Sequence, residues 1–133
     1  MKKEKSCGCI VFNDEKSVLL AKMNAGHWSF PKGHMEGTET EQETALRETL
    51  EETNVECQIL DGFRETNTYS PFPGVIKDVI FFVAKQKWPF LKKQESEIAE
   101  IGFFSSESAK RMITYKEDLK IFDDALRFIE GKI

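Results

Sequence analysis

The chain has 133 residues, about the length of one domain. Its 19 Lys and Arg against 23 Asp and Glu leave a net charge of −4, which disfavours long-range attraction to nucleic acid or to an anionic membrane. Hydrophobic residues make up 40%, and no apolar run approaches the roughly 18 residues of a membrane span. We therefore expect one domain over residues 1–133, with a buried core and no membrane segment.

The cysteines indicate a reducing compartment. Cys7, Cys9 and Cys57 are odd in number, and no two have the CxxC spacing of a zinc or redox site. The apolar run that begins at Cys7 ends at Phe12, which is too short for an export signal. We expect reduced, buried cysteines in a cytoplasmic protein.

The first part of the chain has strand character. Apolar residues over 7–12 and 17–21, with the polar residues 13–16 between them, predict a β-hairpin. Residues 24–31 contain glycine, proline and two aromatic residues, which predicts a loop or an irregular strand.

The clearest helix is predicted over residues 38–54. Both Thr38 with Glu41 and Thr40 with Glu43 match the capping-box spacing at its start. Asn54 suits the left-handed stop position at its end.

The remaining elements follow from short apolar runs and helical spacing. We expect a strand over 55–66, a long loop over 67–74, and a strand over 75–85 whose consecutive apolar residues indicate burial on both faces. The chain is then expected to form a loop from Trp88, a weaker strand over 97–104, a short helix over 105–112 and a longer helix over 116–129.

The helix over 38–54 carries two contrasting faces. At about 100° per residue, one arc is expected to pack on the core; it contains Ala45, Leu46, Thr49, Leu50 and Thr53. The opposite arc is acidic, with one cation; it contains Glu41, Arg47, Glu48, Glu51 and Glu52. Like charges such as Glu48 and Glu52 repel each other at this spacing. A divalent cation would relieve that repulsion, because Mg²⁺ prefers carboxylate oxygens. The alternative is a solvated acidic face.

The loop before this helix favours a ligand. Gly33 and Gly37 permit sharp turns with exposed backbone groups, and Lys32 places a cation beside them. A backbone carbonyl, a lysine and an acidic helix face together suit a metal–polyphosphate substrate.

These residues together resemble the Nudix box, Gx5Ex7REUxEExGU. Gly33 is followed after five residues by Glu39, and after seven more by the run from Arg47 to Val55. Two positions differ from the pattern, and neither is a carboxylate. Thr49 replaces an aliphatic residue, and Asn54 replaces a glycine whose left-handed conformation asparagine tolerates.

Within the Nudix family the chain looks most like the diadenosine tetraphosphate (Ap4A) hydrolases. The similar segments are residues 28–36, 45–49, 63–65 with Tyr69, 77–81, Glu97 with Phe103, and Tyr115 with Lys116. The resemblance implies an α/β/α sandwich around a central mixed β-sheet, with a loop–helix–loop that holds Mg²⁺ or Mn²⁺.

The resemblance also implies a set of metal-binding and catalytic residues. The metal ligands would be the carbonyl of Gly33 and the carboxylates of Glu48, Glu51, Glu52 and Glu97. Arg47 would orient these glutamates, and Glu39 would support the loop. Glu48, Glu51 and Glu97 are candidates for the general base, although Glu97 could equally be a surface residue of an acidic stretch.

The implied activity is hydrolysis of a phosphoanhydride bond in a small-molecule nucleotide, with Ap4A cleaved asymmetrically. Tyr69 and Tyr115 would sandwich the adenine, and Lys32 and Lys77 would hold the phosphates. The two histidines are expected to make loop hydrogen bonds rather than to do chemistry. Two alternatives stay open: a pyrophosphohydrolase of (d)NTPs or other nucleoside diphosphate derivatives, and a non-catalytic nucleotide-binding domain.

Overall fold

The computed structural model describes residues 1–87 and 98–133. The loop predicted from Trp88 onward and the candidate ligand Glu97 therefore lie outside the described residues.

Within the described residues the strands form one mixed, eight-stranded sheet. The strands are β1 (Lys2–Phe12), β2 (Val18–Met23), β3 (Trp28–Ser29), β4 (Lys32–His34), β5 (Cys57–Ile59), β6 (Glu65–Tyr69), β7 (Val75–Gln86) and β8 (Ile98–Phe104). The central order is β3-β2-β1-β7-β5, while β4 pairs with β1, β6 with β7 and β8 with β2. The β1–β7 pair is parallel and the others are antiparallel.

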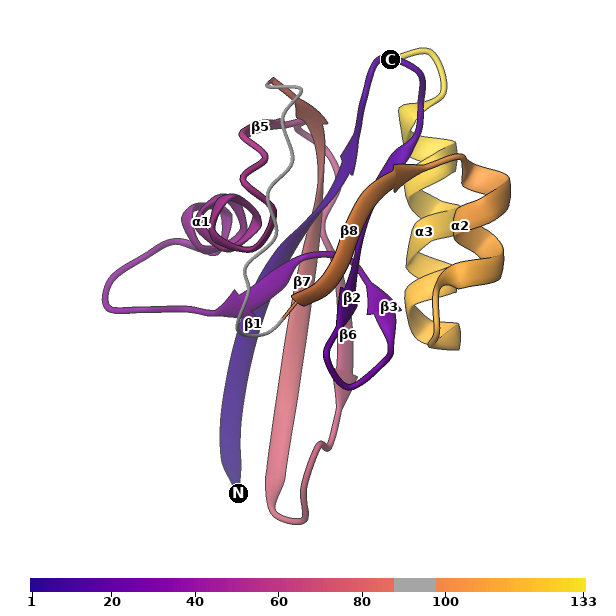
Figure 1. Ribbon diagram of the computed structural model, residues 1–133. Coiled ribbons are helices and arrows are strands. Elements are labelled where there is room, and N and C mark those ends of the chain that lie inside the picture. Colours follow the sequence, from indigo (N-terminus) through magenta and orange to yellow (C-terminus); the bar gives the residue numbers. More distant parts are fainter. Residues whose placement is uncertain (88–97) are drawn as a thin grey trace.

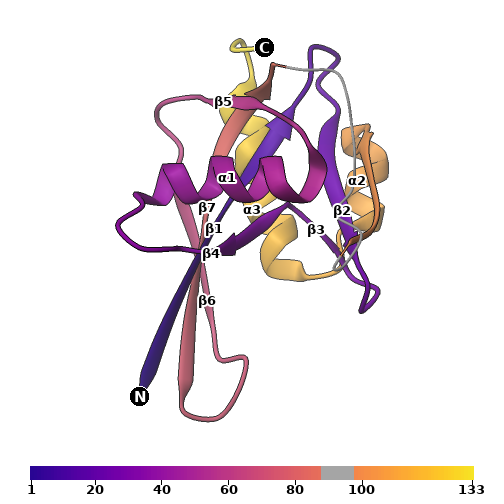
Figure 2. The ribbon, with the colours of Figure 1, turned by 60° about the vertical axis from the view of Figure 1, so that its left-hand side comes forward.

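Helices cover both faces of this sheet. Helix α1 (Glu41–Thr53) lies on one face, and α2 (Ser106–Met112) and α3 (Lys116–Ile129) lie on the other (Figures 1 and 2). This arrangement confirms the predicted α/β/α sandwich. No helix in the described ranges is long and apolar enough to cross a membrane.

The central strands β1 and β7 are buried on both faces, as their continuous apolar runs predict. Cys7, Cys9 and Val11 point into the core under α1, while Ile10 and Phe12 point into the core under α3. The parallel register runs from Lys2–Val75 to Phe12–Lys85 along the whole of β1. All three cysteines are buried and free.

The strand predicted over 55–66 is wrong in one respect, because the chain there forms two strands. Strands β5 and β6 both pair with β7, but the intervening residues leave the ladder at Gly62, which has a φ of 107°. The loop predicted over 67–74 also begins later than expected. Strand β6 continues to Tyr69 because it pairs with β7 as far as Lys77.

The ends of α1 follow local capping. Thr40 is the N-cap, and its side chain and that of Glu43 form the reciprocal capping box. The alternative box at Thr38 is therefore not used. Asn54 closes the helix at a φ of 62°, and its N–H donates to the carbonyl of Leu50 at 2.8 Å.

The buried face of α1 differs from the predicted one. Leu50 is 47% exposed, whereas Glu52 is 4% exposed. The helix packs through small residues, and the hydroxyls of Thr49 and Thr53 bond to carbonyls one turn back, at 2.8 and 2.6 Å. The buried arc is therefore rotated by about 70° on the helical wheel toward the glutamates. This rotation turns Glu48 and Glu52 toward the sheet.

Candidate active site

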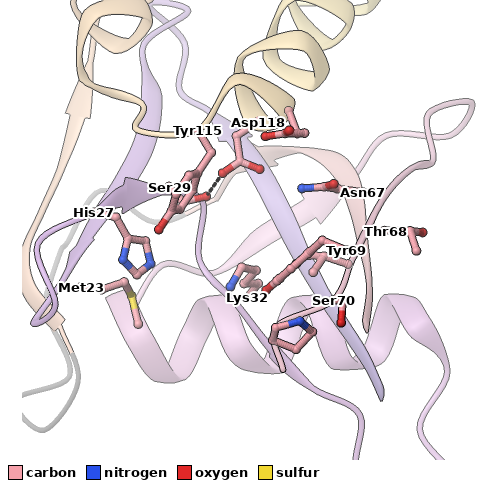
Figure 3. Close-up of a pocket in the computed structure, with 13 residues that line it drawn as sticks. Met23, His27, Ser29, Lys32, Asn67, Thr68, Tyr69, Ser70, Tyr115 and Asp118 are labelled. Carbon is pink, nitrogen blue, oxygen red and sulfur yellow. Dashed lines mark hydrogen bonds between the residues drawn. The ribbon is translucent and has the colours of Figure 1, made fainter. Parts of the chain in front are cut away.

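Two adjoining cavities lie at the edge of the sheet near β4. The carboxylate cavity, of about 370 Å³, is lined by Ser6, Met23, Lys32, Gly33, His34, Glu36, Glu48, Glu51, Glu52 and Lys77. The tyrosine cavity, of about 610 Å³, is lined by Met23, His27, Ser29, Lys32, Asn67, Thr68, Tyr69, Ser70, Pro71, Val79, Tyr115, Glu117 and Asp118 (Figure 3). Lys32 and Met23 line both cavities, so the two cavities adjoin each other.

The carboxylate of Glu48 lies directly against the backbone of Gly33. A Cβ added at Gly33 would overlap the carboxylate carbon and oxygens of Glu48. Glycine is therefore required here for close packing, because any side chain would push the carboxylate away from β4. Burial raises the pKa of Glu48, while its hydrogen bond from Arg47 acts in the opposite direction.

Arg47 connects three carboxylates and the loop before the helix. Its Nε and Nη2 donate to Glu39 at 2.6 and 3.0 Å, and its Nη1 donates to Glu48 at 2.8 Å and to Glu51 at 3.2 Å. Its Nη2 also donates to the carbonyl of His34 at 3.0 Å. The like charges on this helix face are therefore compensated by one guanidinium.

Glu39 fastens the loop to the helix. Its carboxylate accepts hydrogen bonds from the N–H of Glu36 at 3.0 Å and from the hydroxyl of Thr44 at 2.9 Å, besides those from Arg47. The hydrogen bonds from Arg47 lower the pKa of Glu39 to about 2. Glu39 does not line the carboxylate cavity.

The acidic face of α1 is not uniformly solvated. Glu52 is buried, and its Oε1 accepts a hydrogen bond from the backbone N–H of Lys32 at 3.2 Å. Glu48, Glu51 and Glu52 all line the carboxylate cavity. Glu41 lies elsewhere: it pairs with Arg64 and Lys5, and the hydrogen bond from Arg64 is the largest cause that lowers its pKa to about 2.

The donor groups fit a partly hydrated divalent cation. Three carboxylates and Gly33 line one cavity, and the absence of a side chain at Gly33 lets the Glu48 carboxylate lie directly against its backbone. In the described ranges no three His, Cys, Asp or Glu side chains form a ready-made cage. Mg²⁺ needs none, because it binds through one or two carboxylates and fills its other positions with water and phosphate oxygens.

Two lysines line the same cavity as the carboxylates. Lys32 comes from β4 and Lys77 from β7, and both line the carboxylate cavity. Burial, and then the charge of Lys32, lower the pKa of Lys77. Two neighbouring cations in a cavity that carboxylates also line match a ligand that carries both phosphate and metal charge.

The tyrosine cavity has aromatic walls from separate parts of the chain. Tyr69 ends β6 and is 41% exposed, while Tyr115 precedes α3 and is 49% exposed. The ring of His27 packs against Tyr115 with 5.5 Å between centroids, and burial lowers its pKa. Both tyrosines project into the same space in Figure 3. His27 and His34 each line a cavity, which the sequence did not predict.

Sequence reasoning missed two further polar residues of this site. Asp118 lies in the first turn of α3, where it is 5% exposed, and it lines the tyrosine cavity. Ser6 lines the carboxylate cavity, and its buried hydroxyl has no hydrogen-bond partner in the described part of the chain. Asp118 follows Tyr115 by three residues at a helix start, which is the one sequence signal that could have pointed to it.

The sandwich with an Arg–Glu helix facing a glycine-containing loop defines the Nudix class of folds. The NUDIX domain family model matches residues 2–125, and the chain belongs to this family. The asymmetrical bis(5'-nucleosyl)-tetraphosphatase of Caenorhabditis elegans is 32% identical over 135 residues, which cover 96% of this chain and 97% of that protein. A C. elegans Ap4A hydrolase structure, determined as a binary complex, superposes with a TM-score of 0.86 at 26% identity, covering 96% of this chain and 98% of that one.

The mouse asymmetrical bis(5'-nucleosyl)-tetraphosphatase is 37% identical over 97 residues. That match covers 62% of this chain and 65% of the mouse protein, so the chain spans about two thirds of the length of this relative.

The pairing of Arg47 with Glu39 predicts an acid-sensitive part of the stability. Because the folded-state pKa of Glu39 is depressed to about 2, its contribution is complete above the ordinary glutamate pKa near 4.5 and is lost as the pH falls toward 2. Arg47→Met should therefore flatten the fall of unfolding free energy between pH 5 and pH 2. Urea unfolding at several pH values measures this slope.

Lys110→Met is the matched control, since it breaks an exposed ion pair with Asp123. Its slope should equal that of the wild type. Parallel curves for Arg47→Met and wild type would show that Arg47 does not depress the pKa of Glu39.

Proposed function

We propose that this protein is a divalent-metal-dependent hydrolase of a phosphoanhydride bond in a nucleoside polyphosphate, and that it cleaves Ap4A asymmetrically to ATP and AMP. The ion is Mg²⁺, with Mn²⁺ as a possible substitute. The partner is a small-molecule nucleotide.

One observation carries the proposal: a cavity with aromatic walls lies beside a cavity with carboxylate walls, and Lys32 lines both. A nucleobase needs a flat π surface to stack on, and a polyphosphate chain needs cations and metal. A nucleoside polyphosphate has these two chemical ends joined in one molecule. The names of the C. elegans relatives point to the same substrate class.

Four glutamates and one backbone carbonyl are the groups that would hold the cation in such a reaction. Glu48, Glu51, Glu52 and the Gly33 carbonyl would hold the cation, together with Glu97. When bound, the cation supplies Lewis-acid polarisation of phosphate oxygens and lowers the pKa of water.

The other side chains orient the substrate and move the proton. Arg47 holds Glu48 and Glu51 at fixed positions through its hydrogen bonds. Lys32 and Lys77 bind phosphate oxygens and offset the charge of the leaving phosphate. The proton of the attacking water passes to a carboxylate, for which Glu48, Glu51 and Glu97 are the candidates.

Product analysis tests the function directly. With Mg²⁺ present, we expect Ap4A to give ATP and AMP, as separated by ion-exchange chromatography. A preference for NTPs, with NMP and pyrophosphate as products, would instead identify a pyrophosphohydrolase. Nucleotide binding without turnover of any polyphosphate would identify a non-catalytic domain. Either of these results would overturn the proposal.

Glu52→Gln tests the carboxylate wall. The amide oxygen can still accept the hydrogen bond from the backbone N–H of Lys32, so the packing of α1 on β4 is retained while the charge is lost. We expect kcat/KM for Ap4A to fall by about 100-fold or more, since a metal contributes several kcal/mol to the transition state.

Glu107→Gln, which changes an exposed residue of α2, serves as the control and should leave kcat/KM unchanged. Unaltered Mg²⁺-dependent turnover in Glu52→Gln would rule out a metal role for that side chain. Circular dichroism of both variants checks the fold.

The two tyrosines test the base site. Tyr69→Ala and Tyr115→Ala should each raise the KM for Ap4A by about tenfold, because stacking contributes roughly 1–3 kcal/mol per base. Tyr115 makes no side-chain capping bond, so its replacement leaves the start of α3 intact. The inhibition constant of inorganic tetraphosphate, which has no base, should not change.

Phe72→Ala is the matched control, because Phe72 is 67% exposed and does not line the tyrosine cavity. Its KM for Ap4A should match the wild type. Stacking would be refuted if the tyrosine variants weakened Ap4A and inorganic tetraphosphate by equal factors.

A further inference from the structure

The tyrosine cavity contains a buried acid that the proposed hydrolysis does not use. Asp118 is 5% exposed and lies at the start of α3, three residues after Tyr115. It belongs to the cavity with aromatic walls and not to the carboxylate cavity. It is therefore separate from the carboxylates of α1 that are proposed to hold the cation.

A hydrogen bond fixes the position of this carboxylate. The hydroxyl of Ser29, which is also buried, donates to Oδ2 of Asp118 at 2.8 Å (Figure 3). Ser29 lies on β3, so the bond joins the start of α3 to the edge of the sheet. An ionised carboxylate offers about four acceptor positions, and Ser29 occupies one.

Burying the carboxylate of Asp118 is energetically unfavourable unless a further hydrogen-bond donor or cation pairs with it. In the described part of the chain no Lys, Arg or His lies within ion-pair distance of Asp118, and Lys32 and His27 act on it at longer range. A buried charge that is neither paired nor fully hydrogen-bonded is unfavourable. A ligand that supplies an N–H donor inside the cavity would remove part of this cost.

A stacked nucleobase can supply that donor. Tyr69 and Tyr115 offer π surfaces on which the faces of a base can stack. The hydrogen-bonding groups of a base lie along its edge, so an acceptor side chain in the same cavity would bind the base at that edge. Adenine carries an exocyclic amino group, N6–H₂, on its edge, and an ionised carboxylate is an acceptor without donors. The two groups are complementary.

We propose that Asp118 is a specificity-determining residue that accepts a hydrogen bond from the exocyclic amino group of the stacked purine. This inference rests on the proposed nucleotide substrate. The tyrosines bind any base, and Asp118 selects a base with an amino group on the edge that reaches it. The ordering of Asp118 by Ser29 pre-forms the acceptor before the base enters.

The test compares two mononucleotides that differ only in this amino group. AMP and purine riboside 5'-monophosphate both stack, but the second has hydrogen in place of the 6-amino group. Neither contains a phosphoanhydride bond, so isothermal titration calorimetry measures their Kd values without turnover. We expect wild-type protein to bind AMP at least about tenfold more tightly, the effect of one hydrogen bond to a charged acceptor.

Asp118→Asn removes the acceptor at nearly constant shape. The amide oxygen takes the hydrogen bond from Ser29, which leaves the NH₂ group toward the ligand, and this group cannot accept. Its Kd for AMP should rise to that for the purine analogue, whose own Kd should not change. Asp123→Asn is the matched control. It makes the same change on the same helix at a residue that does not line the tyrosine cavity, so it should retain the preference for AMP.

Equal affinity of the wild type for the two nucleotides would overturn the inference without any variant. A preference for AMP that persists in a folded Asp118→Asn protein would also overturn it. The hydrolase proposal and this inference would be refuted by different results. If base discrimination depends on Asp118 but Ap4A is not cleaved, the specificity role stands and the proposed activity falls; cleavage of Ap4A without discrimination gives the reverse result.

Discussion

The close contact between helix α1 and strand β4 is the constraint on which the site depends. Like-charged carboxylates on one helix face repel each other, and in this protein that face also packs toward the sheet. The contact persists because Gly33 leaves room for Glu48, because the backbone N–H of Lys32 donates to Glu52, and because the guanidinium of Arg47 spans the remaining acids. Hydrogen bonds therefore compensate a charge distribution that is unfavourable because like charges repel on one helix face.

The same short strand links the two cavities. Lys32 bonds to Glu52 through its backbone, while its side chain lines both the carboxylate and the tyrosine cavities. A shift of β4 would therefore move the carboxylate wall and the Lys32 side chain together. The parallel β1–β7 pair, buried under helices on both faces, provides the rigid support for this arrangement.

Features set by neighbouring residues could be predicted from the sequence. The capping box at Thr40, the left-handed stop at Asn54 and the bounds of α3 depend on local hydrogen bonds and spacing, and the structure confirms them. Features set by distant contacts could not. The exposure of Leu50 depends on how far α1 is rotated on the sheet, and the length of β6 depends on its pairing with β7.

The site shows the same division. The spacing of the acids on one helix indicated the carboxylate wall, because i, i+3 and i+4 positions share a helix face. Asp118 belongs to no such cluster of acids. Its spacing from Tyr115 is a weak signal, since one aspartate at a helix start more often interacts with the helix dipole. Only the tertiary structure buries it, bonds it to Ser29 of β3 and places it in the cavity that the two tyrosines also line. A helix dipole alone could stabilise an exposed acid at that position equally well. The burial of Asp118 beside the two tyrosines in one cavity is therefore the feature that the proposed hydrogen bond to a base accounts for.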